Sequence, residues 1–336
     1  MGGAGLALCA ALLASGGGIM PAAAAELDPG VKELVPLGQA VGIKLFSDGV
    51  LVVGLSTVDT AAGPAAPGKT CGLRMGDRIT HINGQKVNTI EEVQAILEQE
   101  RDGDLTLQVV REDQNLQLTA QGVETASGQY QLGVWLRDSM AGIGTMTFYD
   151  PDSGVFAALG HGINDVDTAQ LMPLESGSVM EAEVDQVQKG EKGQPGQLQG
   201  IFNLEEDLGV LYANTDRGIF GRMEEDTLTE GTEPVPVAQA KEVSVGSAVI
   251  LSTISGDNVE EYTVEIKEIH EKGGTRNLVL EVTDPRLLET TGGIVQGMSG
   301  SPILQNGKLV GAVTHVLVND PTKGYGILIE NMLDAA

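Results

Sequence analysis

The chain has 336 residues, 41% of them hydrophobic, 3% aromatic and 20% charged, and this composition excludes collagen, coiled coil and wholesale disorder. Its 47 acidic and 20 basic residues give a formal net charge of -27. A nucleic-acid partner is therefore not expected, because phosphate backbones are bound by clustered lysine and arginine. The length predicts two domains, because single cores stop growing at about 250 to 300 residues.

The N-terminal segment predicts an export signal or a single weak membrane anchor. Residues 1–25 carry no charged side chain and combine the apolar run Leu6–Leu13 with a glycine triplet and small residues of the A-x-A type. The first basic residue is Lys32, so the usual positive region is missing, and Leu8 before Cys9 does not fit a lipoprotein signal. No other stretch is long and apolar enough to span a bilayer. We expect an exported protein whose membrane contact is this segment.

The first half of the chain is the less acidic half, with a net charge of -4 over residues 37–122 against -21 over residues 123–336. Its local signals are a strand-like run (Gly49–Leu55), a Gly-Asp-Arg-Ile sequence ending at Ile79, an Asn83-Gly84 hairpin turn and an amphipathic helix capped by Thr89. Cys71 begins this segment's glycine-punctuated turn and has no partner for an intramolecular disulfide, because the other cysteine lies in the N-terminal segment. In this order the signals resemble a PDZ domain of the bacterial protease-associated type, covering residues 36–122.

A PDZ domain binds a peptide C-terminus as an added strand and holds its carboxylate with the backbone N–H groups of a glycine-hydrophobic loop. The resemblance places that loop at Val41, Gly42 and Ile43. The same residues also fit a plain strand that leads into the domain, so both interpretations stay open.

Residues 63–70 satisfy the phosphate-loop pattern G-x-x-x-x-G-K-T. Pro64 and Pro67 have no N–H with which to bind a phosphate, and a glycine-rich turn follows where a helix is needed. We therefore expect a flexible loop without a nucleotide. No H-E-x-x-H and no cysteine pair occurs, and Asp165 with Asp167 is too little for a calcium loop, so no metal and no cofactor is predicted.

From Gly122 onward, short apolar strands alternate with glycine turns, which predicts a β-sandwich or barrel. The segment Gly297–Pro302 resembles the G-x-S-G-[GS]-P segment of chymotrypsin-like serine proteases. Glycines around Ser299 allow a sharp turn that exposes its hydroxyl and directs the N–H groups of Gly297 and Ser299 toward one oxyanion. The alternative is a glycine-serine turn without chemistry.

A nucleophilic serine needs a base, and the sequence offers four histidines, His81, His161, His270 and His315. His161 lies between two glycines at the end of an apolar run, where a strand end would hold a general base. His81 belongs to a strand of the first domain, and His270 lies in a polar surface stretch. His315 follows the serine hairpin and either lines a specificity pocket or belongs to the core.

The segments Leu159–Gly162, Thr283–Pro285, Gly293–Pro302 and Thr314–Pro321 resemble the stage IV sporulation protein B family, the SpoIVB serine peptidases, over nearly the whole chain. The resemblance implies a mainly β chain in which a PDZ domain precedes a chymotrypsin-like β-barrel peptidase domain over residues 123–336. It also implies a catalytic triad with His161 as base, Asp284 as the residue that orients it, and Ser299 as nucleophile. Asp207 is the alternative acid, because double-barrel proteases usually take their aspartate from the middle of the chain.

The same resemblance implies a biological role. Such peptidases are exported into the space between the forespore membranes, where they remain membrane-associated or are released, and they process themselves. They then cleave a regulatory protein of an intramembrane protease, which triggers sigma factor processing. The alternative is a membrane-tethered PDZ scaffold with an inactive peptidase domain.

Overall fold

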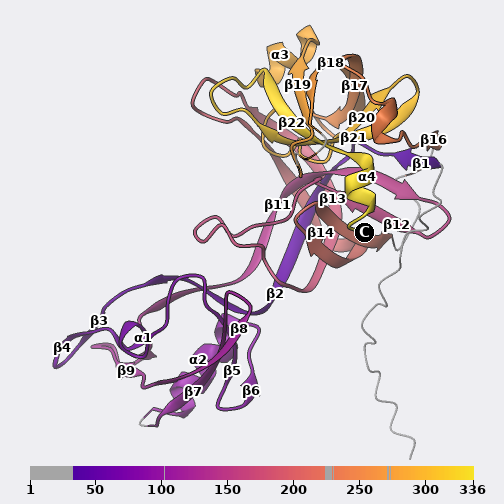
Figure 1. Ribbon diagram of the computed structural model, residues 1–336. Coiled ribbons are helices and arrows are strands. Elements are labelled where there is room, and N and C mark those ends of the chain that lie inside the picture. Colours follow the sequence, from indigo (N-terminus) through magenta and orange to yellow (C-terminus); the bar gives the residue numbers. More distant parts are fainter. Residues whose placement is uncertain (1–32, 102, 224–228, 230, 271, 273) are drawn as a thin grey trace, which may run out of the picture.

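The computed structural model describes residues 33–336 except residues 102, 224–228, 230, 271 and 273. The signal or anchor predicted for residues 1–25 lies outside this part of the chain. Strands dominate, and they form a PDZ-like domain and a larger domain that contains a closed barrel (Figure 1). The mainly β fold, with an α+β domain before a barrel domain, is confirmed. Among the helices described, none is both long and apolar enough to cross a membrane.

The PDZ-like domain extends from the second half of β2 (Ala40–Leu55) to the start of β11 (Val134–Asp150). Its other elements are β3 (Val58–Thr60), β4 (Gly63–Ala65), α1 (Pro67–Thr70), β5 (Arg78–Ile82), β6 (Gln85–Lys86), α2 (Ile90–Gln99), β7 (Leu105–Arg111), β8 (Gln114–Ala120), β9 (Val123–Glu124) and β10 (Tyr130–Gln131). Helix α2 buries one apolar face in the core of this domain. It begins as predicted, because Thr89 and Glu92 form a reciprocal capping box.

The stretch with the phosphate-loop letters has regular secondary structure, which corrects the expectation of a loop. It forms β4 and the single turn of α1, and the N–H of Gly68 donates to the carbonyl of Leu132 at 2.6 Å. The turn begins at Pro67, which has no N–H, and it ends after four residues. A helix this short does not provide the successive N–H groups that hold a phosphate.

Two long strands connect the domains. β2 and β11 pair antiparallel along most of their length, from Leu55 opposite Val134 to Ala40 opposite Thr145. In the PDZ-like domain β2 also pairs with β5, and in the larger domain it pairs with β13 (Leu174–Gln188). The two domains therefore share a sheet, and Figure 1 shows β2 and β11 running from one domain into the other. We call these two strands the arm.

The prediction that Val41, Gly42 and Ile43 form a carboxylate-binding loop is wrong. These residues are buried inside β2 and belong to the larger domain, not to the domain predicted to begin at residue 36. β11 pairs with them on one side and β13 on the other, so no edge is free for an added peptide strand. An apolar segment buried on both faces is a central strand, whereas a binding loop needs exposed N–H groups.

The larger domain, here called the barrel domain, combines a sheet with a closed barrel of six strands. The sheet contains β1 (Glu33–Pro36), β12 (Val155–Ala158), β13, β14 (Gln197–Thr215), β15 (Gly218–Met223) and β16 (Val235–Pro236), together with the barrel-domain halves of β2 and β11. The barrel order is β17 (Gly246–Thr253), β18 (Val259–Ile269), β19 (Leu278–Val282), β22 (Lys323–Leu328), β21 (Lys308–Val316) and β20 (Pro302–Gln305). The short helices are η2 (Ala240–Glu242), α3 (Pro285–Thr291) and α4 (Ile329–Leu333).

Candidate active site

The turn before β20 carries Ser299 and lies directly against the backbone of β11. At Gly300 the φ angle is 101°, and a Cβ atom there would lie 1.9 Å from the carbonyl oxygen of Thr145, so only glycine fits. Thr145 donates its N–H to the Ser299 carbonyl at 3.0 Å and its hydroxyl to the Gly297 carbonyl at 2.7 Å. These contacts fix the position of Ser299 on the sheet.

Two backbone N–H groups of this turn are available to a ligand. The N–H groups of Met298, Gly300 and Ser301 donate to backbone carbonyls. Those of Gly297 and Ser299 donate to no other residue in the described part of the chain, and both residues line a cavity. They are the two donors predicted for an oxyanion hole, and that role stays a prediction.

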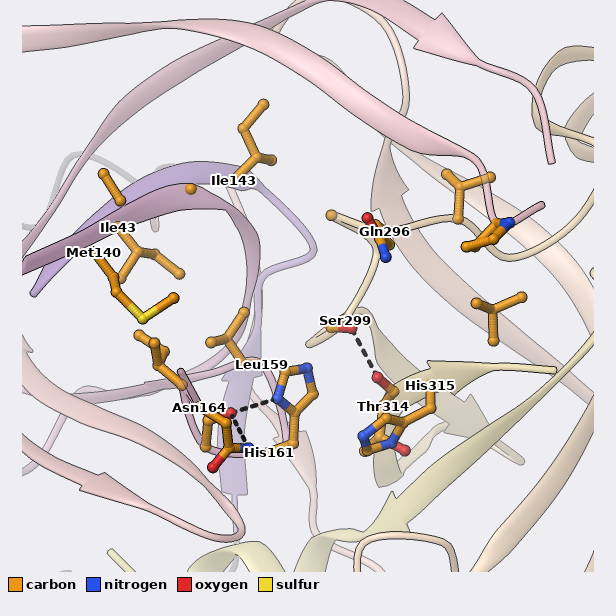
Figure 2. Close-up of a pocket in the computed structure, with 18 of the residues that line it drawn as sticks. Ile43, Met140, Ile143, Leu159, His161, Asn164, Gln296, Ser299, Thr314 and His315 are labelled. Carbon is orange, nitrogen blue, oxygen red and sulfur yellow. Dashed lines mark hydrogen bonds between the residues drawn. The ribbon is translucent and has the colours of Figure 1, made fainter. Parts of the chain in front are cut away.

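The hydroxyl of Ser299 donates to the carbonyl oxygen of Thr314 at 2.7 Å. Thr314 lies on β21, the strand that follows the serine hairpin, and it also lines the cavity. The hydroxyl is therefore bonded to a neighbouring strand and not to a histidine (Figure 2). Attack on a substrate requires it to turn from this carbonyl toward a base.

His161 follows a sharply bent segment at the end of β12. Leu159 has a φ angle of 69°, and the N–H of Gly160 donates across it to the carbonyl of Ala158 at 2.9 Å, which makes a γ-turn. A γ-turn with a left-handed central residue is rare and strained, and such strain is concentrated at functional sites. On the other side of the histidine, a Cβ atom at Gly162 would lie 2.4 Å from the backbone carbonyl oxygen of Thr215. Gly160, which has a φ angle of 65°, is thus favoured by backbone geometry, and Gly162 is required by close packing.

The ring of His161 has a defined orientation. Its Nδ1 lies 2.8 Å from the carbonyl oxygen of Gly162, which can only accept a hydrogen bond, so Nδ1 carries the proton and Nε2 is free to accept one. In Figure 2 the second ring nitrogen is on the side of Ser299. Burial lowers the pKa of His161, and the bond to Gly162 opposes this shift. A neutral ring with a free Nε2 is the form that a general base requires.

His315 lies beside His161, with 4.9 Å between the ring centroids and an angle of 34° between the planes. Burial, together with the charges of His161 and Arg276, lowers the pKa of His315 to about 4, so it is neutral at physiological pH. Its Nδ1 is buried and has no partner among the described residues. Of the two sequence-based interpretations, a residue that lines the site agrees with its position in the cavity wall.

The cavity has a volume of about 510 Å³ and lies where the sheet of the barrel domain meets the closed barrel. One wall is apolar and comes from the arm and from the residue that follows β12: Ile43, Met140, Ile143 and Leu159. The other contains the polar groups from the barrel domain: His161, Asn164, Gln296, Ser299, Thr314 and His315 (Figure 2). Apolar walls with a few convergent polar groups are typical of a ligand-binding or active site.

Asp284, the predicted third member of a triad, does not line this cavity. It is the N-cap of α3, where its carboxylate accepts hydrogen bonds from the N–H groups of Arg286 and Leu287. Its carboxylate also pairs with the Arg286 guanidinium and accepts from the N–H of Thr263. The bonds from Arg286 hold the pKa of Asp284 below its usual value. The structure therefore gives Asp284 a helix-capping role and does not bring it to His161.

The alternative acid, Asp207, is exposed on β14 opposite Met180 and is also absent from the cavity wall. The group that orients His161 here is the carbonyl of Gly162. Sequence reasoning missed this contact because every residue has a backbone carbonyl, and it missed Thr145 and Thr314 because their contacts form only when separate strands come together. Within the described residues no three His, Cys, Asp or Glu side chains gather as metal ligands would.

Two regions of the chain match known families. Residues 128–333 match the model of the SpoIVB peptidase S55 family, and residues 58–111 match a PDZ domain. No curated protein is similar enough to count as a match. Both family matches agree with the resemblances found in the sequence.

Among solved structures, the chain is similar to the Rv3671c protease in an inactive form, with 16% identity over 58% of this chain and 82% of that chain and a TM-score of 0.32. A serine-to-alanine mutant of Rv3671c from M. tuberculosis H37Rv is similar with 15% identity over 57% of this chain and 79% of that chain, and its TM-score is also 0.32. Likeness at this level says nothing about the chemistry of the site.

Proposed function

Because the chain belongs to the SpoIVB peptidase S55 family, we propose that it is a serine endopeptidase in which Ser299 is the nucleophile and His161 the general base. The observation that carries this proposal is that Gly297 and Ser299 line one cavity with His161, which is far from them in the sequence. The N–H groups of Gly297 and Ser299 have no hydrogen-bond partner among the described residues. This is the set of groups that acyl transfer needs.

The proposed reaction begins when the Ser299 hydroxyl leaves the Thr314 carbonyl and donates its proton to Nε2 of His161. The oxygen then attacks the substrate carbonyl carbon, and the oxyanion that forms is stabilised by the N–H groups of Gly297 and Ser299. His161, now protonated, gives the proton to the leaving amine, and water then releases the acyl group by the same route. No net proton is consumed by the enzyme.

No carboxylate takes part in this scheme. The Gly162 carbonyl keeps Nδ1 of His161 protonated, which is the tautomer that the aspartate of a triad maintains. A carbonyl does not compensate the charge of an imidazolium as a carboxylate does, so we infer a catalytic dyad of modest rate. Asp284 supports the fold of the barrel domain and has no direct part in the chemistry.

The biological role is also proposed on family membership. In this proposal the protein is exported, is held at or released from the membrane of the forespore intermembrane space, and processes itself. It then cleaves a regulatory protein of an intramembrane protease, which triggers sigma factor processing. The PDZ domain contributes peptide or protein interaction, at a surface other than Val41–Ile43.

One observation favours a second candidate, a PDZ scaffold whose peptidase domain is inactive. Ser299 donates its hydrogen bond to the Thr314 carbonyl rather than to His161, as an idle serine would. The two candidates differ in whether Ser299 can be activated without any change elsewhere in the chain.

The test is labelling of the full chain with a fluorophosphonate, which reacts with activated serines. Wild type, Ser299→Ala and His161→Ala are compared, and mass spectrometry maps the modified residue. Labelling at Ser299 that requires His161 supports the peptidase. Absence of labelling in a folded wild type, with membranes and candidate peptides present, favours the scaffold.

A further inference from the structure

A small hairpin begins two residues after His161 and forms part of the cavity wall. In residues 163–172 the N–H of Met172 donates to the carbonyl of Ile163 at 2.9 Å, and the N–H of Asp165 donates to the carbonyl of Gln170 at 2.8 Å. We call this segment the histidine hairpin. Ile163 and Asn164 line the cavity beside His161, so a displacement of the hairpin moves both the base and the wall.

Asn214 on β14 holds the base of the histidine hairpin. Its side-chain oxygen accepts from the N–H of Ile163 at 2.9 Å. Its side-chain nitrogen donates to the carbonyls of Ile163 at 3.0 Å and Met172 at 2.8 Å. The two ends of the hairpin are therefore bonded to one side chain of the barrel domain.

Asp165 closes the hairpin from inside. The residue is 1% exposed, and its carboxylate accepts hydrogen bonds from the N–H groups of Asp167 and Thr168 and from the Thr168 hydroxyl. Burial alone would raise the pKa of Asp165, but the bonds from Thr168 and Arg137 outweigh it and lower the pKa. A buried carboxylate needs a cationic partner, and here that partner is Arg137. The same guanidinium bonds the exposed carboxylate of Asp167 at 2.8 Å.

Arg137 comes from the arm, where the chain passes from the PDZ domain to the barrel domain. The preceding residue, Leu136, pairs with Val52 and packs on the PDZ core. The following residue, Asp138, accepts from the N–H of Ile90, the first residue of α2, at 2.9 Å. Three successive residues of β11 thus contact the PDZ core, the histidine hairpin and the PDZ helix.

Two further contacts join the PDZ domain to the same region. Gln170 of the histidine hairpin lies against Gly76, where an added Cβ atom would be 2.6 Å from the Gln170 side-chain nitrogen. Lys86 pairs at 3.1 Å with Glu175, which lies just beyond the hairpin on β13. The contacts of the PDZ domain therefore converge on the segment that follows His161.

We propose that Arg137 is a positioning residue for His161, which it holds in place through Asp165 and the histidine hairpin from the arm that carries the PDZ domain. The inference rests on the proposed function and adds a route by which the PDZ domain affects the catalytic base. Without the guanidinium, Asp165 is a buried charge without a cation, and the hairpin must open to hydrate it. The Gly162 carbonyl and the ring it orients then lose their fixed position. A catalytic group displaced by about 1 Å can lower a rate by about 100-fold.

The test compares full-length Arg137→Gln and Arg137→Lys with wild type. Arg101→Gln is the matched control, because Arg101 also pairs with an acid but is exposed in the turn that follows α2. The first readout is the rate of fluorophosphonate labelling against pH. We expect at least about a tenfold slower rate in Arg137→Gln, an intermediate rate in Arg137→Lys, and the wild-type rate in Arg101→Gln.

The pH profile separates positioning from a merely structural role. Burial holds the pKa of His161 down, so opening of the hairpin raises that pKa and moves the acid limb of labelling to higher pH. Among the described residues that line the cavity, the other titratable group is His315, whose pKa is also lowered by the charge of Arg276. Both residues are present in wild type and in every variant, so they do not account for a difference between the pH profiles. The proposal is overturned if wild type and both Arg137 variants have the same labelling rate and if that rate falls at the same acidic pH in all three.

Two measurements do not depend on activity. An NMR titration of His161 and hydrogen exchange at the Ile163 and Met172 amides report on the hairpin even if wild type is not labelled, in which case the proposed function alone fails. Faster exchange and a raised His161 pKa in Arg137→Lys, at an unchanged thermal midpoint, support the positioning role. Unchanged exchange and titration overturn it. If Arg137→Gln does not fold, Arg137→Lys carries the test.

Discussion

Replacing Asp284 by asparagine separates a triad acid from a helix cap. Asparagine caps a helix about as well as aspartate, so Asp284→Asn keeps the bonds to the N–H groups of Arg286 and Leu287 and loses mainly an ion pair with an exposed arginine. Alanine at this position removes the cap and is expected to cost about 1 kcal/mol of stability. If Asp284 instead oriented His161, the asparagine change would lower the rate by about 10⁴-fold while leaving the fold intact.

The assay is the rate of fluorophosphonate labelling at Ser299, measured beside the urea midpoint of unfolding. We expect Asp284→Asn to label within about threefold of wild type at a similar midpoint. We expect Asp284→Ala to unfold at lower urea. A fall of 10³-fold or more in Asp284→Asn at an unchanged midpoint would refute the dyad, because no capping effect is that large.

Four further outcomes follow from the structure. Gly300→Ala is expected to lower the free energy of unfolding by about 3 kcal/mol or more and to abolish labelling at Ser299. Gly307 also has a left-handed φ angle but has open space around it, so Gly307→Ala is expected to lower that free energy by only about 1 kcal/mol. Urea unfolding of both variants checks this. Labelling of wild type should persist below pH 6.5, because the base must be neutral and burial lowers the pKa of His161. A labelling rate that already falls with acidification at or above pH 6.5 would contradict this. The folded state should lose stability as the pH falls from 6.5 toward about 4, because in this range His315 is protonated in the unfolded chain but stays neutral in the folded chain. Thermal midpoints measured across that range give the loss. Asn214→Ala should slow labelling by about tenfold or more and speed amide exchange in the histidine hairpin, while wild-type exchange there would count against its role.

The parts of the site that sequence reasoning found are those with local causes. Gly300 and Gly160 lie at backbone angles that favour glycine, so the turn around Ser299 and the bend before His161 left marks in the sequence. The cap at Thr89 is likewise a local pattern that the structure confirms. Such features depend on a few neighbouring residues, and their residue types report them directly.

The tertiary structure decided what depends on strand pairing. Val41–Ile43 has the letters of a binding loop, but β11 and β13 bury it as a central strand. Asp284 has the neighbours of a triad acid, but its carboxylate is bound by the N–H of Thr263 on β18 as well as by the start of α3. Thr314 and Arg137 acquire their contacts with Ser299 and Asp165 only when separate parts of the chain come together, and a backbone carbonyl and a lone arginine carry no distinctive sequence pattern. By itself the sequence determined the family, the order of the domains, and Ser299 and His161 as candidates, because these rest on local motifs. The register in which distant strands pair decided which groups surround Ser299 and His161, and this register is set by burial of side chains over the whole sheet.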